Sequence, residues 1–285
     1  MTLRRMIDWL ERHRGLNLLF IGVYFAIIIA MHDVLANLSV SIVAEISLPT
    51  YDVVIACIGL GLALLALWIL IRNGRRHRHR FPTQILLGAG TLILLLVHSR
   101  ILSVMNIEAI HFLQFMFLAM LVFPLFRRVL PTLAITLIFA FADELYQYLL
   151  LYPERESYLD FNDVIMDLYG MGMGMVFLIS AKVEWNDPIK FTRHPVFYIW
   201  TSILTLTTIL LATGTFAFYQ TEQTKNALFF FNENPPGGPF WVEFYESGIS
   251  FHILSPWEGA IILLAVLGFY SIADRNSPKT NTPQT

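Results

Sequence analysis

Between residues 100 and 155 the sequence carries ionisable side chains of the kinds that acid–base chemistry and anion binding require. His111 and Glu144 are the candidates for a general acid and base, because a carboxylate can orient an imidazole and tune its basicity. Arg100 and Arg155 are the candidates for holding a phosphate or another anion through charge-assisted hydrogen bonds. Together they indicate a site that binds an anionic group and could transfer protons.

Further polar side chains on the next elements of the chain would position hydroxyl groups or a divalent ion. Gln147 lies three residues after the candidate glutamate, so the two side chains share one helix face. Asp163 and Asp167 are four residues apart, and the same stripe continues through two glycines at the spacing that allows close helix contact. Such a contact would turn both aspartates toward the inside of a helix bundle. The glycines are Gly170 and Gly174.

These residues also have an ordinary structural interpretation. A polar side chain near the end of a membrane helix can extend to water at little cost, as Glu108 could. A buried carboxylate needs a partner, so Arg100 or Arg155 could neutralise Glu144 and Asp163 in a purely structural ion-pair network. The residue types alone do not separate these interpretations.

The sequence predicts no metal site and no cofactor. His98, His111, Glu144 and Asp163 could supply metal ligands in number, which leaves a metal hydrolase as a minor variant. No HExxH-type spacing supports it. The single cysteine, Cys57, lies in an apolar block, so neither a cysteine metal cluster nor a nucleophilic cysteine is indicated.

The elements that must position these side chains are long apolar segments. Of the 285 residues, 56% are hydrophobic and only 14% are charged, with a mean hydropathy of +0.61. A bilayer core needs about 20 apolar residues per helix, and hydrocarbon leaves no other partner for the backbone amides. We therefore predict an all-α polytopic bundle of about eight spans, at residues 16–36, 53–71, 82–102, 107–126, 130–151, 163–182, 196–219 and 257–273.

The distribution of lysine and arginine predicts the orientation of the bundle. With both termini in the cytoplasm, 16 of the 19 basic residues fall on the inner side, as the positive-inside rule requires. The exceptions are Arg100, Arg155 and Lys225. Residues 73–80 then form a basic cytoplasmic loop near anionic headgroups. Residues 220–256 form an aromatic outer loop that lies on the interface or caps a cavity, and the C-terminal tail looks disordered.

In this orientation the candidate site residues of the predicted third to sixth spans all fall in the outer half of the membrane. The inner halves of the same spans are almost wholly apolar. Ionisable residues inside a membrane are costly and usually functional. We therefore expect a sealed inner half and a polar pocket that opens outward.

The same residues resemble the VanZ-like family of bacterial membrane proteins, over about residues 107–178. The family pattern has a helix with Asp-Lys-x-x-His-Phe, a helix ending Asp-Glu-x-x-Gln, an arginine, and a helix with Asp-x-x-x-Asn-x-x-Gly-x-x-x-Gly. The matching residues are His111-Phe112, Asp143-Glu144-Leu145-Tyr146-Gln147, Arg155, Asp163, Gly170 and Gly174. The resemblance implies a four-helix core at residues 82–182, between an N-terminal helix pair at 1–81 and a C-terminal helix pair at 183–285.

The sequence departs from the family pattern in ways that make the site more acidic. Ile107 and Glu108 stand where the family has Asp-Lys, and Asp167 replaces an asparagine. The family's namesake is linked with resistance to the glycopeptide teicoplanin. The resemblance thus implies a multi-pass protein of the bacterial cytoplasmic membrane, acting at its outer face.

Three functions are compatible with this sequence. The first is binding, with or without modification, of a lipid-linked or glycan- or phosphate-bearing envelope substrate, with an effect on antibiotic resistance. The second is a non-enzymatic scaffold or ligand-binding protein with a structural ion-pair network. The third is a transporter or flippase, which the apolar inner halves disfavour. Membrane lipids and a lipid-linked envelope intermediate are the expected partners, and the nearly neutral charge indicates no nucleic acid.

Overall fold

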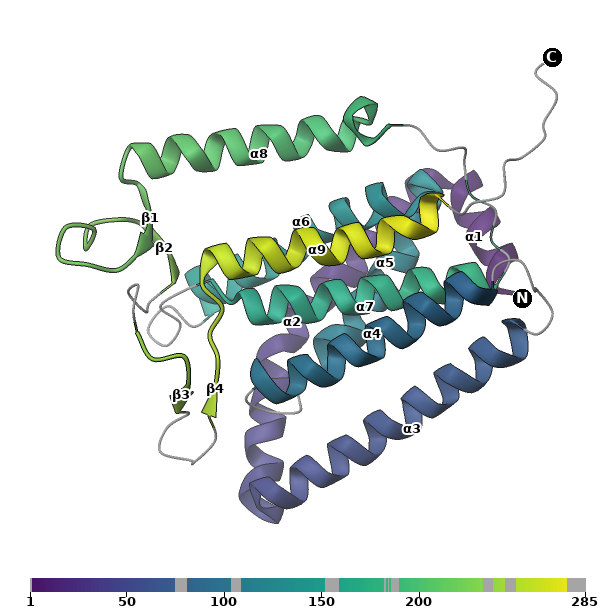
Figure 1. Cartoon of the computed structure of the whole chain (residues 1–285), viewed down its shortest axis with the longest axis horizontal. Coiled ribbons are helices and arrows are strands. Elements are labelled where there is room, and N and C mark those ends of the chain that lie inside the picture. The colour runs from purple at the N-terminus through teal and green to yellow at the C-terminus, as the bar shows by residue number, and fades with distance from the viewer. Residues whose placement is uncertain are drawn as a thin grey trace.

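The computed structural model describes residues 2–74, 81–103, 109–151, 159–181, 183, 185, 190–232, 238–243 and 250–275. Helices dominate this part of the chain (Figure 1). A π-helical turn, Gln147–Leu151, continues the sixth helix, and a short 3₁₀ turn, Phe191–Arg193, precedes the eighth. The α-helices are α1 Leu3–Arg12, α2 Arg14–Ile46, α3 Leu48–Gly74, α4 Phe81–Ile101, α5 Ala109–Phe126, α6 Val129–Tyr146, α7 Phe161–Ser180, α8 Pro195–Ala212 and α9 Pro256–Arg275.

Each of the eight predicted apolar blocks coincides with one of the helices α2 to α9, which confirms the all-α membrane bundle. Within the described residues, six helices are long and apolar enough to cross a membrane. A seventh apolar segment, Ile110–Phe126, is shorter than these six. The total of eight spans and the orientation with both termini inside stay predictions.

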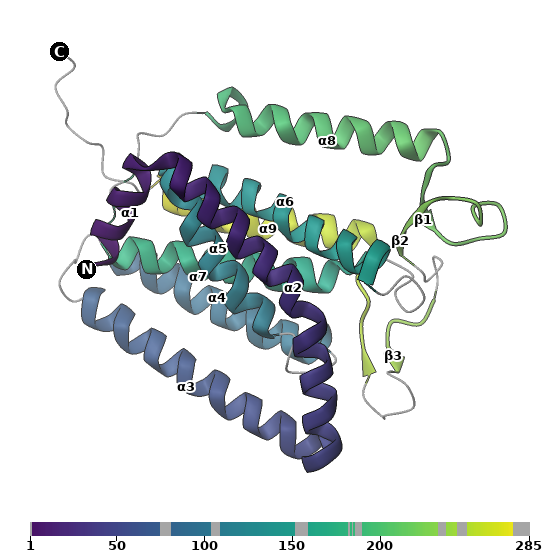
Figure 2. The same cartoon turned by 180° about the vertical axis from the view of Figure 1, so that it is seen from behind.

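Helix α7 is the centre of the bundle. All of its residues except Asp163 and Phe177 are buried. It is packed by α4, α5, α6 and α9, which lie nearly parallel to it (Figures 1 and 2). The glycines of α7 allow this approach: a Cβ at Gly172 would collide with the ring of Tyr270 on α9. The Tyr270 hydroxyl also lies 2.7 Å from the Thr91 hydroxyl on α4, so a buried hydrogen bond joins the helices on two sides of α7.

Helices α2, α3 and α8 lie at the periphery. Figures 1 and 2 both show α8 standing apart from the bundle. Its apolar side chains Leu204, Leu206 and Ile209 are exposed, as expected for a surface that faces lipid. The indole of Trp200 donates a 2.8 Å hydrogen bond to the Ala134 carbonyl on α6, which fastens α8 to the bundle.

The predicted seventh span was wrong at its end. It was expected to run to residue 219, but α8 ends at Ala212. Gly214 adopts a φ of +75°, a conformation that no helix can continue. The chain then forms β1 Phe216–Tyr219, which pairs in parallel with β2 Phe229–Asn232. β3 Val242–Glu243 and β4 Ser250–Phe251 form a second, antiparallel pair.

The aromatic loop packs on the end of the bundle that carries these strands. The rings of Phe229 and Tyr148 lie 5.0 Å apart, which places β2 against the π-helical turn after α6. The buried Asn162 side chain at the start of α7 donates to the carbonyl oxygens of Leu102 and His252 at 2.9 and 2.8 Å. It also accepts a hydrogen bond from the Leu254 amide. A single side chain thus joins α4, α7 and the segment that leads into α9.

The opposite end of the bundle carries α1. Arg127, between α5 and α6, donates from Nη2 to Asp8 at 2.6 Å and to Glu11 at 2.7 Å. Asp274 of α9 accepts hydrogen bonds from the amides of Val129 and Leu130 at the first turn of α6. These contacts lock α1 and α9 onto the turn between α5 and α6.

Candidate functional site

Close packing of α5 on α7 builds the floor of the site. A Cβ at Gly170 would collide with the Phe112 carbonyl, and a Cβ at Gly174 would lie 2.7 Å from the Met116 carbonyl oxygen. Because the two glycines have no side chains, the backbones of α5 and α7 approach closely along this stripe. His111 precedes Phe112, so the same contact sets its ring against the first turns of α7.

His111 lies between two aspartates of α7. Its Nε2 atom is 3.8 Å from Oδ2 of Asp163, and its Nδ1 atom is 3.3 Å from Oδ1 of Asp167. The shorter contact is within ion-pair distance but is not aligned as a hydrogen bond. Asp167 is fully buried, whereas the Asp163 side chain keeps 17% of its surface exposed. The buried histidine is therefore held between two carboxylates, of which only Asp163 is partly exposed.

Helix α6 contributes polar side chains from its last turns. Glu144 is buried, and its Oε1 atom accepts a 3.0 Å hydrogen bond from Nε2 of the Gln147 side chain. The helix changes to its π-helical turn at Gln147, and such turns are frequent at functional sites. Asp143 is also fully buried, and neither of its carboxylate oxygens has a hydrogen-bond partner in the described part of the chain.

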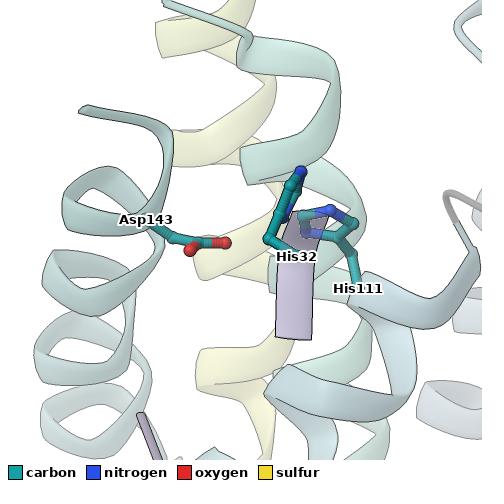
Figure 3. A group of neighbouring side chains, drawn as sticks. All are labelled: His32, His111 and Asp143. Atoms are coloured by element: carbon teal, nitrogen blue, oxygen red, sulfur yellow. The ribbon is translucent and has the colours of Figure 1, made fainter. Parts of the chain in front are cut away.

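The fourth helix that contributes a side chain is α2, which supplies His32. Its ring centroid lies 5.6 Å from that of His111, with the two planes at 69°. Figure 3 shows the carboxylate of Asp143 directed toward these two rings. His32 was not among the candidate residues predicted from the sequence. Its place in the outer half of the predicted first span was the signal that could have found it.

Ligand-type atoms of these side chains approach closely in two groups that share His111. In the first, atoms of His32, His111 and Asp143 all lie within 4.8 Å of one another. In the second, the same limit holds for His111, Glu144 and Asp163. We call the whole set the His111 cluster: His32, His111, Asp143, Glu144, Gln147, Asp163 and Asp167.

The structure thus brings together five of the residues singled out in the sequence, namely His111, Glu144, Gln147, Asp163 and Asp167. Their catalytic and binding roles stay predictions. Arg100 is exposed near the end of α4. His98, buried on α4, packs against Tyr169. The candidate anion ligand Arg155 lies outside the described residues, as does Glu108.

Another carboxylate, Asp160, lies just before α7 at the same end of the bundle. It is the N-cap of α7, and its side chain accepts a 2.7 Å hydrogen bond from the Asn162 amide. Burial raises the pKa of Asp160, while hydrogen bonds from the backbone amides of Asn162 and Asp163 act in the opposite direction. This carboxylate adds negative charge near the N-terminus of α7.

Long apolar helices around a buried polar cluster define a polytopic helical membrane protein. The model of the VanZ/LLP1 family matches residues 24–182, more than half of the chain, and the protein belongs to this family. The match begins within α2 and so includes His32 as well as the residues of α5, α6 and α7. No curated protein and no solved structure matches the chain.

Proposed function

We propose that the His111 cluster binds a lipid-linked or glycan- or phosphate-bearing envelope substrate at the outer face of the bacterial cytoplasmic membrane. The observation that carries the proposal is the convergence of polar side chains from α2, α5, α6 and α7 on one place at one end of an apolar bundle. Burial of so many ionisable groups within membrane helices costs stability, so a purely structural protein has little reason to retain them.

The positions of the side chains suggest how such a substrate is handled. Asp163 is partly exposed and contacts His111, so a group that enters beside Asp163 reaches the imidazole. Glu144 lies close to both residues and is oriented by Gln147. His111 and Glu144 then act as the acid–base pair, and Asp163, Asp167 and Gln147 position the hydroxyl groups of the substrate.

A non-enzymatic structural network is the second candidate function. Its support is the placement of His111 between Asp163 and Asp167, which resembles a buried ion-pair network. In that case, replacing a member of the cluster lowers stability and has no separate effect on ligand binding. The two candidates are therefore separated by measuring thermal stability and binding on the same variants.

The test uses the full chain purified into lipid nanodiscs and long-chain polyprenyl phosphate as the probe. Native mass spectrometry should show wild-type protein retaining polyprenyl phosphate in preference to the matching uncharged polyprenol. His111→Gln and Glu144→Gln should lose this preference while melting within a few degrees of wild type. His98→Gln is the matched control, because His98 is a buried histidine outside the cluster. Equal binding of both lipids by wild type would overturn the proposal.

Stability loss in His111→Gln and Glu144→Gln with an unchanged lipid preference would instead support the structural network.

An effect on glycopeptide resistance is a separate expectation. A bacterial strain that expresses wild-type protein should tolerate more teicoplanin than one that expresses Glu144→Gln at equal membrane abundance. Identical inhibitory concentrations for the two strains would remove resistance from the proposed role.

A further inference from the structure

Asp143 presents a problem of charge compensation that the acid–base roles do not solve. Its side chain is fully buried, its oxygens have no hydrogen-bond partner in the described chain, and Figure 3 shows it directed at the rings of His32 and His111. An unpaired carboxylate inside a membrane bundle is strongly disfavoured. His111 does not compensate it alone, because it also lies beside the carboxylates of Asp163 and Asp167, and one imidazolium carries only one positive charge.

The two histidines and this carboxylate form the kind of ligand set that holds a divalent transition metal. Zn²⁺ and related ions are bound in proteins by imidazole nitrogens and carboxylate oxygens, and sites with three protein ligands keep a position open for water or substrate. The ligand-type atoms of His32, His111 and Asp143 already lie within 4.8 Å of one another. In a tetrahedral site, with bonds of about 2.1 Å, ligand atoms are about 3.4 Å apart. Shifts of about 1 Å in the positions of the ligand atoms are therefore enough to close the three side chains around an ion.

The surroundings of this ligand set also favour a cation. Glu144 and Asp163 share His111 with it in the second close group, and Asp167 lies 3.3 Å from the same ring. Carboxylates in this position orient metal-bound imidazoles and add negative charge around the ion. Without a cation, a phosphate group would be repelled by the cluster, because like charges repel strongly at low dielectric constant.

We infer that His32, His111 and Asp143 bind one divalent transition-metal ion, for which Zn²⁺ is the representative probe, with an open position directed toward the substrate. This inference deepens the proposed function and rests on it only for the role of the ion, which is to accept an oxygen of the substrate's phosphate or hydroxyl group. With the ion bound, His111 serves as a ligand, so the proton transfer of the proposed function falls to Glu144. Binding of the ion itself depends on the three side chains alone.

The experiment measures metal binding without any substrate. The full chain is purified in detergent with its affinity tag removed, stripped with a chelator, and titrated with Zn²⁺ and with Co²⁺. Wild type should bind about one Zn²⁺ per chain by elemental analysis after gel filtration, and Co²⁺ should give the visible absorption of a site containing histidine nitrogen. Zn²⁺ should also raise the melting temperature, because a ligand that binds only the folded state stabilises it.

Two nearly isosteric variants test the ligands. Asp143→Asn and His32→Gln should each weaken Zn²⁺ binding by at least about tenfold, since even outer-shell partners of a metal site are worth about 10- to 100-fold. Both should lose the Co²⁺ absorption and the Zn²⁺-induced rise in melting temperature. His98→Gln is the control and should bind as wild type does, because it removes a buried histidine outside the ligand set.

Two results would overturn the inference. One is a wild-type protein that binds no more Zn²⁺ than the Asp143→Asn and His32→Gln variants. The other is loss of the ion in Glu144→Gln together with full binding in Asp143→Asn and His32→Gln, which would assign the ion to the second group. Polyprenyl phosphate binding is scored separately on the stripped and the Zn²⁺-loaded protein. Lipid preference without stoichiometric Zn²⁺ refutes only the metal site, and stoichiometric Zn²⁺ without lipid preference refutes only the proposed function.

Discussion

The two ends of the helix bundle both contain buried charged residues, but these residues are treated in opposite ways. At the α1 end, Arg127 contacts two carboxylates, and Asp274 accepts two backbone hydrogen bonds. At the other end, acidic side chains gather around His111, and the buried carboxylate of Asp143 has no hydrogen-bond partner in the described chain. The first arrangement satisfies its charges and connects helices. The second leaves Asp143 without a hydrogen-bond partner in the described chain, so under the proposed function the α1 end is structural and the His111 end is functional.

The largest expected effect is the difference in lipid binding between a substitution at the His111 end and a substitution at the α1 end. His111→Ala should weaken polyprenyl phosphate binding by about 100-fold or more, equivalent to about 3 kcal/mol, because it removes the side chain common to both close groups. Its melting temperature should also fall, because the truncation leaves a cavity and removes the partner shared by Asp163 and Asp167. Binding is therefore compared with that of a variant destabilised at the other end. Arg127→Met at the α1 end should leave binding intact. Lipid titrations on both proteins in nanodiscs give the answer, and equal loss of binding in both would abolish the contrast between the ends.

The second prediction concerns the close contact that places the functional end. Gly170→Ala should destabilise the fold by about 1–3 kcal/mol, because its Cβ would collide with the Phe112 carbonyl, and the backbone of α5 must move away. That movement carries His111 away from Asp163 and Asp167, so lipid or Zn²⁺ binding should fall as well. Thermal melting in detergent and the binding assays measure the two effects.

The control for this variant is a glycine in open surroundings. A Cβ at Gly22 of α2 has nothing within 4 Å, so Gly22→Ala should be neutral or stabilise the helix by up to about 1 kcal/mol. If both alanine variants melt at the wild-type temperature, the close contact of α5 with α7 is not what holds His111 in place.

The third prediction tests the structural end directly. Arg127→Met should lower the free energy of unfolding by about 1–2 kcal/mol, because Asp8 and Glu11 lose their shared partner but stay more than one-third exposed to water. The methionine keeps much of the buried apolar stem. Denaturation monitored by circular dichroism measures the loss. A decrease of similar size in Glu144→Gln would show that the two ends do not differ in the way we infer.

Several features of the fold and of the His111 cluster could be predicted from the sequence, for physical reasons. The long apolar segments had to be helices, and the 170–174 glycine spacing correctly indicated that Asp163 and Asp167 face inward. Helical periodicity placed Gln147 on the same helix face as Glu144, and the structure shows the two side chains joined by a hydrogen bond. Short-range periodicity along one helix was sufficient for each of these features.

The group that was missed, in which His32 joins His111 and Asp143, depends on contacts between helices distant in sequence. His32 is on α2 and Asp143 is on α6, so no local spacing relates them, and the two-histidine group with Asp143 has no sequence signature. Arg100 was expected at the site because it shares the outer half of the membrane; its side chain is exposed near the end of α4, and its role in binding stays a prediction. The strands of the outer loop were missed because short paired segments depend on the surface on which they pack.

The smallest expected effect concerns the cap that α9 provides for α6. Arg128, the N-cap residue of α6, makes no side-chain hydrogen bond to the helix, so the Asp274 carboxylate satisfies the amides of Val129 and Leu130 in its place. Asp274→Ala should therefore cost about 1 kcal/mol, as loss of an N-cap does, while Asp274→Asn should cost less because its amide oxygen still accepts. Melting temperatures would follow the order wild type, Asp274→Asn, Asp274→Ala. Zn²⁺ and lipid binding should be unchanged in both variants, since a carboxylate whose hydrogen bonds are made within the protein needs nothing from a ligand. A change in either binding constant would show that the two ends are coupled through α6.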